Sequence, residues 1–239
     1  MTDSAMTDEH SDFCGGVVME NLTITQEYYI CVANDKGTIS VYDHKAATCL
    51  IAAGVLDMSL ENCVGIDSKT VEVTGKLPDN IAFLRPLYDT IDQGKAIKLS
   101  KVVESYIASF SDKKLKELIG SVVTTLEGAG VMESVKTGIF KSKEGRAPSQ
   151  ASVNGVVEKI RAEILEDGEL SDEAVALAAL LDRAGKLKDY FSKYEHKELR
   201  ARLTDIKKSE AGKSVKEMAD YIDGLMASML AVVTTTTGA

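Results

Sequence analysis

The sequence contains no tryptophan, only three prolines, and few aromatic residues, which make up 5% of its 239 residues. β-Sandwiches and barrels are enriched in aromatic and β-branched residues, so this composition favours helices. Hydrophobic residues make up 44% and charged residues 27% of the chain, close to the averages of folded domains. A chain of this length buries enough apolar surface to fold without a disulfide or a metal.

The residues that commonly carry metal sites and catalysis are sparse and poorly spaced. The four cysteines lie 17, 18 and 14 residues apart with no Cys-x-x-Cys pair, and only three histidines are present, so no zinc framework is expected. Cys31 and Cys49 lie in apolar stretches and are expected to be reduced core residues. The segment 212–214 (Gly-Lys-Ser) resembles the end of a phosphate-binding loop, but Lys207 occupies the position of the first glycine. We therefore expect no enzyme, no cofactor and no metal.

Long apolar runs without charges are also missing. The longest, residues 225–233, is about half of the ~18–20 residues that a membrane span needs. Residues 1–16 are polar and acidic, unlike a signal peptide. We expect a soluble, cytoplasmic chain in which residues 17–233 form one helical domain, 1–16 are disordered and 234–239 are frayed.

Apolar residues recur at helical spacing along most of the chain. Residues 46–56 are small and apolar on nearly all sides, which predicts a central, buried helix. Thr23 with Gln26 has the spacing of a capping box, and Asp112 and Ser171 are expected to cap later helices. The expected helices are 22–33, 46–56, 80–91 (interrupted at Pro86), 99–110, 113–129, from 149 or 152 to 166, 172–183, 187–194, 197–208 and 215–233.

Short β-branched runs bounded by turn residues predict a few strands. Residues 38–42 alternate like a strand, and 63–66 with 70–74 predict a hairpin. A second hairpin is expected from 131–135 and 139–142, with its turn at residues 136–138. The expected fold class is therefore mainly α, a single multi-helix domain with a central hydrophobic helix and short β-hairpins.

The net charge of −9 is unevenly placed. Residues 95–146 contain ten Lys and Arg against six Asp and Glu, so this segment is +4 while the remainder sums to −13. Asymmetry of this kind is typical of a protein with one side that meets an anionic partner.

Four phrases of the sequence resemble the Golgi phosphoprotein 3 family, which has many bacterial members; we expect this chain to be one of them. The phrases are LTITQEYYICVANDKGTIS, ATCLIAAGVLDMSLE, VVTTLEGAGVM and LSDEAVALAALLDRAGKLKDYF, and the resemblance spans roughly residues 17–232. It implies a mostly α-helical domain with a hydrophobic central helix. Eukaryotic members are peripheral membrane proteins that bind phosphatidylinositol 4-phosphate at the Golgi and hold the cytoplasmic tails of resident enzymes.

The resemblance also indicates where a lipid head group would bind. The loop tryptophan of the eukaryotic members falls on Tyr42, and one of three head-group arginines falls near Ala47, two residues from Lys45. The other two arginines fall on Lys116 and Ile119. Tyr42, Lys45 and Lys116 are therefore the expected lipid or anion site. Because only arginine offers a planar fork to a phosphate, these replacements predict weakened phosphoinositide specificity.

A β-hairpin of the family aids membrane contact and self-association, and it matches residues 131–146. Basic residues beside apolar ones suit insertion at a bilayer interface, where cations meet head groups. The expected membrane-contact residues are Lys136, Ile139, Phe140, Lys141, Lys143 and Arg146. The partners implied are an anionic membrane lipid or phosphoinositide-like head group, a protein partner, and a second copy of the chain bound through the hairpin.

Other classes of function stay open at this point. Helix 99–110, helix 113–129 and the following hairpin also describe a winged helix, a nucleic-acid-binding unit. Against it, the second helix carries a Val-Val-Thr-Thr run (122–125) where base-reading side chains are needed, and the net charge of −9 disfavours binding to phosphates. A purely structural protein that oligomerises through its hairpin is the third alternative.

Overall fold

A computed structural model describes residues 22–40, 42–67, 69–107, 112–137, 143–166, 170–208, 223–224 and 227. The segment 1–16, the tail 234–239 and most of the helix expected at 215–233 lie outside these residues. The described part is mainly α-helical with two small antiparallel sheets, which confirms the expected fold class.

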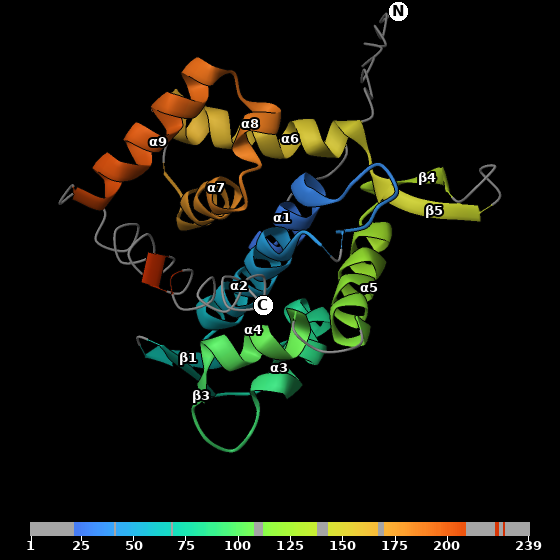
Figure 1. The fold of residues 1–239 in the computed structure, drawn as a ribbon, viewed down its shortest axis with the longest axis vertical. Helices are drawn as coiled ribbons and strands as arrows, with labels where there is room; N and C mark the ends of the chain where they lie inside the picture. The colour runs from blue at the N-terminus through green and yellow to red at the C-terminus, as the bar shows by residue number, and fades with distance from the viewer. Residues whose placement is uncertain are drawn as a thin grey trace, which may run out of the picture.

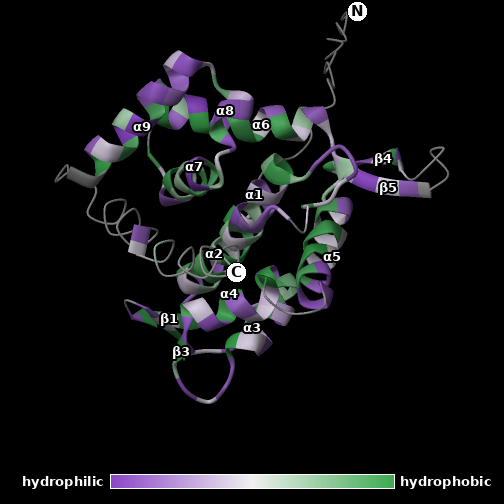
Figure 2. Cartoon of the chain, viewed as in Figure 1, coloured by the Kyte–Doolittle hydropathy of each residue, from purple (hydrophilic) through white to green (hydrophobic). Residues whose placement is uncertain are grey.

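Helix α2 (His44–Leu60) lies at the centre of the molecule, as the sequence predicts (Figure 1). Its residues 46–58 are all buried, because α1 (Ile24–Val32) and α7 (Asp172–Ala184) pack against it. All nine residues of α1 are buried as well. Figure 2 shows hydrophobic residues along these interior helices and hydrophilic ones along the periphery. A single hydrophobic cluster extends from Ile24 in α1 to Ile206.

Two sets of hydrogen bonds hold the start of α1. Thr23 and Gln26 form the predicted capping box, in which each side chain accepts the other residue's backbone N–H. The buried carboxylate of Asp57, from α2, accepts the N–H groups of Ile24 and Thr25, both at 3.0 Å. These first N–H groups have no partner within their own helix. Asp57 therefore fixes the position of α1 along α2.

Helix α6 (Gln150–Ile160) is joined to the core by an ion pair. It begins at Ser149, one of the two expected positions, and continues into a π-helical turn at Arg161–Leu165. The ammonium of Lys159 donates to both carboxylate oxygens of the buried Glu27 in α1, each at 3.0 Å. Burial raises the pKa of Glu27 although Lys159 acts to lower it, so Glu27 depends on this partner to remain charged.

A three-stranded antiparallel sheet packs near the end of α2. Strands β1 (Val64–Asp67) and β2 (Thr70–Val73) form the predicted hairpin. Strand β3 (Ile97–Lys98), which the sequence does not predict, pairs with β2. A strand of two residues is too short to show alternation, so its pattern carries no signal.

Between β2 and β3 the chain forms two consecutive helical segments. A 3₁₀ helix (Asp79–Leu84) leads into α3 (Arg85–Ile91). Pro86 lies in the first turn of α3, where its missing N–H removes no helical hydrogen bond. The predicted interruption at Pro86 is therefore confirmed, as a restart of the helix.

Helices α4 (Leu99–Ile107) and α5 (Lys113–Gly128) follow at the expected places. Helix α5 is followed by Gly130 in the left-handed conformation, with a φ of +71°. Its start differs from the prediction, because no side-chain hydrogen bond caps it. The carboxylate of Asp112 instead pairs with the ammonium of Lys116 at 3.2 Å.

Strands β4 (Met132–Thr137) and β5 (Lys143–Pro148) form a two-stranded hairpin that projects from the helical body (Figure 1). The predicted register is wrong. Residues 136 and 137, expected in the turn, extend β4 and pair with the first two residues of β5. Strand β5 reads Lys-Glu-Gly-Arg-Ala-Pro and lacks an alternating run of large apolar residues, so no pattern marks it; residues 138–142 lie outside the described part.

In the last helices the predicted cap at Ser171 is confirmed, whereas one helix boundary differs from the prediction. Helix α7 starts at Ser171, whose hydroxyl accepts an N–H of the first turn, and ends at Gly185 with a φ of +73°. Helices α8 (Leu187–Tyr190) and α9 (Lys193–Lys208) are divided earlier than expected. Ser192 and Glu195 exchange hydrogen bonds in a capping box that begins α9.

The prediction of a strand at 38–42 is wrong for the described residues of that segment, because they do not pair with another strand. The side-chain oxygen of Asn34 accepts the N–H groups of Lys36 and Thr38. The hydroxyl of Tyr29 donates to the carbonyl of Gly37 at 2.5 Å. A turn organised by Asn34 therefore replaces the strand.

We predict that Asp57→Asn reduces the pH dependence of folding. Burial raises the pKa of Asp57 from 3.8 to about 6, against the hydrogen bonds from Thr25 and Ile24 that act to lower it. The stability that its protonated form contributes is complete below about pH 4 and is lost as the pH rises through 6. Wild type should therefore gain about 1 kcal/mol more than Asp57→Asn between pH 7 and pH 5 in urea unfolding. An identical gain in both proteins contradicts this assignment.

Candidate functional site

The segment that enters α2 presents the expected aromatic residue to solvent. Tyr42 is 86% exposed. Asp43 caps α2 by accepting the N–H of Ala46 at 3.1 Å, which fixes the chain direction at this point. Lys45, in the first turn of α2, is exposed on the same short segment. Tyr42 and Lys45 are therefore available together to a ligand.

A further cation reaches this segment from the turn that follows α7. The ammonium of Lys186 lies 3.1 Å from the carboxylate of Asp43. The sequence gives no signal for Lys186, because only the packing of the end of α7 against the start of α2 brings the two residues together. Ala47, where the family places an arginine, is buried. Lys186 is thus engaged by Asp43, the residue that follows Tyr42 in the chain.

Lys116, the third residue of the expected site, lies in the first turn of α5 and is paired with Asp112. Among the described residues, no hydrogen bond, ion pair or ring contact joins Lys116 to Tyr42 or Lys45. Ile119, the other family position on α5, is partly buried against the core. The described contacts therefore do not join Lys116 to the segment of Tyr42 and Lys45.

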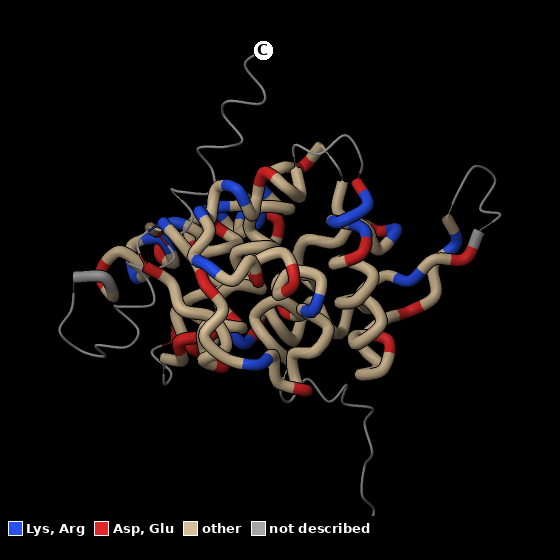
Figure 3. Tube along the Cα trace, turned by 90° about the horizontal axis from the view of Figure 1, so that it is seen from below, with Lys and Arg blue, Asp and Glu red and all other residues tan. Residues whose placement is uncertain are grey.

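The hairpin carries cations, but acids accompany them. Lys136 is exposed and lies directly across from Glu144 in the ladder. Arg146 pairs with Glu127 of α5 at 3.2 Å. Figure 3 shows both signs of charge along the hairpin. Of the other expected contact residues, Lys143 is described only by its backbone, and Ile139, Phe140 and Lys141 lie outside the described part.

A close backbone contact fixes the base of the hairpin to the helical body. Gly37 has a φ of +67°, and a side chain there would place its Cβ 1.5 Å from the carbonyl oxygen of Arg146. The turn after α1 therefore packs directly on β5. Hydrogen bonds also join the two chain ends at the base of the hairpin. There the carbonyl of Val131 accepts the Ser149 N–H and the Ser152 hydroxyl.

Arginines and lysines are used differently in this molecule. The chain has six arginines, and five of them are ion-paired with a carboxylate: Arg85, Arg146, Arg161, Arg183 and Arg200. The sixth, Arg202, also has an interaction partner. By contrast, ion pairs occupy only Lys116, Lys159 and Lys186 among the lysines of the described ranges. Exposed lysines therefore supply the uncommitted positive charge.

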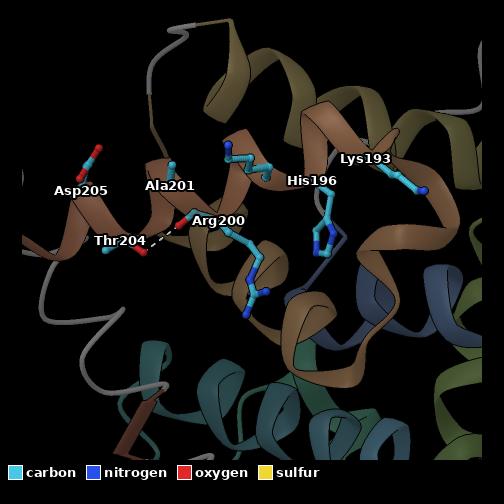
Figure 4. Close-up of a pocket in the computed structure, with 7 residues that line it drawn as sticks. Lys193, His196, Arg200, Ala201, Thr204 and Asp205 are labelled. Carbon is cyan, nitrogen blue, oxygen red and sulfur yellow. Dashed lines mark hydrogen bonds between the residues drawn. The ribbon is translucent and has the colours of Figure 1, made fainter.

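A cavity of about 590 Å³ runs along α9 (Figure 4). His196 and Arg200 point to the same side, where Asp182 of α7 contacts both, each at 3.3 Å. Lys193 points away from them. Because Lys193 points away and Asp182 engages the guanidinium of Arg200, this cavity does not gather positive charge around one ligand.

The cysteines of the described ranges are buried, and no metal cluster is found there. Cys31, Cys49 and Cys63 are buried and unbridged, as expected for Cys31 and Cys49. Burial raises the pKa of Cys49 to about 12, so its thiol stays protonated at neutral pH. No group of three His, Cys, Asp or Glu side chains within the described ranges could hold a metal ion.

The winged-helix alternative gains no support from the helices that suggested it. The order of α4, α5 and hairpin is as expected, but α5 carries its lysines only in the first turn. Farther along, its exposed residues include Thr124 and Glu127, and Glu127 is occupied by Arg146. A helix that reads bases needs donors and cations along its exposed face.

These features define a helical domain built on a buried central helix, with an exposed aromatic loop and a projecting hairpin. The sequence matches the family model of Golgi phosphoprotein 3 (GPP34) over residues 24–222. The chain therefore belongs to the Golgi phosphoprotein 3 family, which confirms the resemblance found in its sequence. No curated protein matches it. Within the described ranges, the helices are all too short or too polar to cross a membrane.

We predict that Gly37→Ala destabilises the protein more than Gly94→Ala. Both glycines have a left-handed φ, +67° and +66°, but a side chain at Gly94 meets no atom within 4 Å. Gly94→Ala should therefore cost about 1 kcal/mol, the conformational term alone. Gly37→Ala must also displace the backbone of Arg146, which should add roughly 2 kcal/mol or more. Equal losses in urea unfolding would show that the turn does not pack on the hairpin.

Proposed function

We propose that this chain is a non-enzymatic binding module that attaches to anionic lipid head groups at a membrane surface. Tyr42 and Lys45 form the head-group contact, Lys116 contributes from α5, and the hairpin adds a second contact with the bilayer. Membership of the Golgi phosphoprotein 3 family supports a binding module of this general kind. The observation that carries the proposal for this chain is the exposure of Tyr42.

An aromatic side chain that is 86% exposed has lost most of the hydrophobic stabilisation that burial gives. A tyrosine ring is well suited to the boundary between water and lipid, because it has an apolar body and a polar tip. Lys45 lies three residues away in the chain, where its ammonium can meet a phosphate or carboxylate. The pairing of an exposed ring with a nearby cation therefore favours an interfacial contact.

The distribution of arginine supports weak selectivity among anionic lipids. An arginine binds a phosphate through two parallel N–H donors, whereas a lysine acts as a compact charge without that geometry. Five arginines already bind carboxylates, and lysines occupy the exposed positions near Tyr42 and on the hairpin. We infer that the contact responds to charge density more than to the pattern of phosphates on an inositol ring.

A protein partner and a second copy of the chain bound through the hairpin stay predictions of the same kind. Strands β4 and β5 pair only with each other in the described sheet, so each has an outer edge. Self-association through such an edge would bring two hairpins to one membrane and strengthen binding through multivalency.

We predict that Tyr42→Ala weakens binding to phosphatidylserine-containing vesicles roughly three- to tenfold, because an interfacial ring is lost. Tyr194→Ala is the matched control, since Tyr194 on α9 is also exposed, at 75%. Co-sedimentation with vesicles measures both. Equal affinity of the two variants would show that Tyr42 does not contact the membrane. A larger loss for Tyr194→Ala would indicate that α9 makes the contact instead.

We predict that the triple variant Lys136→Glu, Lys141→Glu and Lys143→Glu loses at least ~100-fold in vesicle affinity, since each juxtamembrane lysine contributes about 1 kcal/mol. The control is Lys188→Glu, Lys193→Glu and Lys197→Glu, which changes the net charge equally on α8 and α9. Its three lysines are exposed. If both triple variants lose the same affinity, net charge governs binding and the hairpin has no special part in it.

A further inference from the structure

The guanidinium of Arg146 joins three elements at the base of the hairpin. Its Nε lies 3.2 Å from Oε1 of Glu127, in the last turn of α5. Its Nη1 donates to the hydroxyl of Ser134 in β4 at 2.5 Å, and Arg146 itself belongs to β5. A single planar group, whose donors have a fixed geometry, therefore connects both strands of the hairpin with the helix that precedes them.

The strand register places this side chain on one face of the hairpin. Ser134 is the cross-strand partner of Arg146, and Lys136 is the partner of Glu144. Successive side chains of a strand point to opposite faces, so these four residues share one face. Lys136 therefore leaves the hairpin on the same face as Arg146, two residues farther from the base.

The opposite face of the hairpin lies against the turn that follows α1. Gly145 precedes Arg146 in the chain, and a Cβ at Gly145 would lie 3.6 Å from the carbonyl oxygen of Lys36 in that turn. The neighbouring Gly37 meets the backbone of Arg146. The base of the hairpin is thus held between this turn and the end of α5. On the α5 side, the contact is the ion pair of Arg146 with Glu127.

The exposure of this ion pair suits a part in orientation more than one in folding. The side chains of Arg146 and Glu127 are 52% and 42% exposed, and ion pairs of this kind stabilise a fold only modestly. A modest free energy is still enough to favour one direction of a projecting hairpin over others. A lipid phosphate, in contrast, would have to compete with the Glu127 carboxylate for the same guanidinium.

We propose that Arg146 is a positioning residue, which sets the direction of the hairpin through Glu127 and Ser134 so that Lys136 meets the bilayer. This inference rests on the proposed function and separates the part of Arg146 from that of the hairpin lysines. Arginine suits this part because its donors reach two acceptors in different directions at once, whereas an ammonium is a compact charge without that geometry.

The first measurement follows the direction of the hairpin without a membrane. Spin labels at Glu144→Cys on β5 and Glu173→Cys on α7, both exposed positions, report the distance from hairpin to body by pulsed EPR. The full chain also carries Cys14→Ser, and its other cysteines are buried: Cys31, Cys49 and Cys63. We expect one narrow distance in this labelled chain and a broader or shifted distribution once Glu127→Gln is added.

The second measurement compares Glu127→Gln with a matched control, Glu133→Gln, by co-sedimentation with phosphatidylserine-containing vesicles. Glu133 is exposed on β4 opposite Ala147, so its replacement changes the net charge equally and leaves the Arg146 contacts in place. Charge alone predicts that both variants bind more tightly than wild type. Positioning predicts that Glu127→Gln binds about two- to fivefold more weakly than Glu133→Gln, the range that an exposed ion pair contributes.

A charge swap separates positioning from head-group binding. Glu127→Arg combined with Arg146→Glu keeps the net charge and can re-form the ion pair in reverse. We expect this double variant to restore the narrow distance and to bind anionic vesicles within about twofold of wild type. A swap that restores the distance but binds more than about fivefold more weakly would make Arg146 a head-group ligand and overturn the inference.

Two further results overturn the inference: an unchanged distance distribution in Glu127→Gln, and vesicle affinity of Glu127→Gln equal to or above that of Glu133→Gln. If wild type binds and the Lys136, Lys141 and Lys143 triple variant loses affinity in either of these cases, the proposed function survives and only the inference fails. Wild-type protein that ignores anionic vesicles contradicts the proposed function, and the inference fails with it. Urea unfolding of each variant excludes misfolding as the cause.

Discussion

The carboxylate of Asp57 is the interaction on which the rest of the structure depends. It lies inside the molecule on the central helix and accepts the first two free N–H groups of α1, each at 3.0 Å. Without it, two backbone donors would be buried without partners, at a cost of about 1–3 kcal/mol each. With it, α1 is held in one position along α2, and the turn after α1 meets the base of the hairpin. The contact of Gly37 with Arg146 then sets where the hairpin leaves the body. A buried charge at the centre of the fold thereby positions a feature at its surface.

Arginine and lysine carry different parts of the positive charge in this molecule. Arginines form ion pairs that join elements, such as the π-helical turn after α6 with α9 through Arg161 and Glu195. These pairs lock the guanidinium groups that would otherwise recognise phosphate with defined geometry. Lysines at the surface remain available, and their ammonium groups attract anions with little demand on shape. A family whose eukaryotic members are implied to grip one phosphoinositide can therefore retain its fold while a member relies on general charge. That is the physical content of the function proposed for this chain.

Local signals in the sequence predicted much of the fold and little of the site. The capping box of Thr23 and Gln26, the restart at Pro86 and the cap at Ser171 follow from backbone hydrogen bonding and conformation, which nearby residues determine. The predicted hairpin register was wrong because the sequence of β5 shows no alternating run of large apolar residues. The prediction that Asp112 caps α5 was wrong, because its carboxylate pairs with Lys116 instead. Lys186 could not be found at all, since its proximity to Asp43 arises from the packing of α7 on α2. Long-range packing leaves no local pattern.

The most direct test of the account compares wild-type binding to three kinds of vesicle: neutral, containing phosphatidylserine, and containing phosphatidylinositol 4-phosphate at the same surface charge. Affinity should be low for neutral vesicles and nearly equal for the two anionic kinds, because lysines and an exposed tyrosine respond to charge and interface. A strong preference for phosphatidylinositol 4-phosphate at matched charge would contradict the proposed lack of selectivity. Protein that stays in the supernatant with all three would contradict the membrane function altogether.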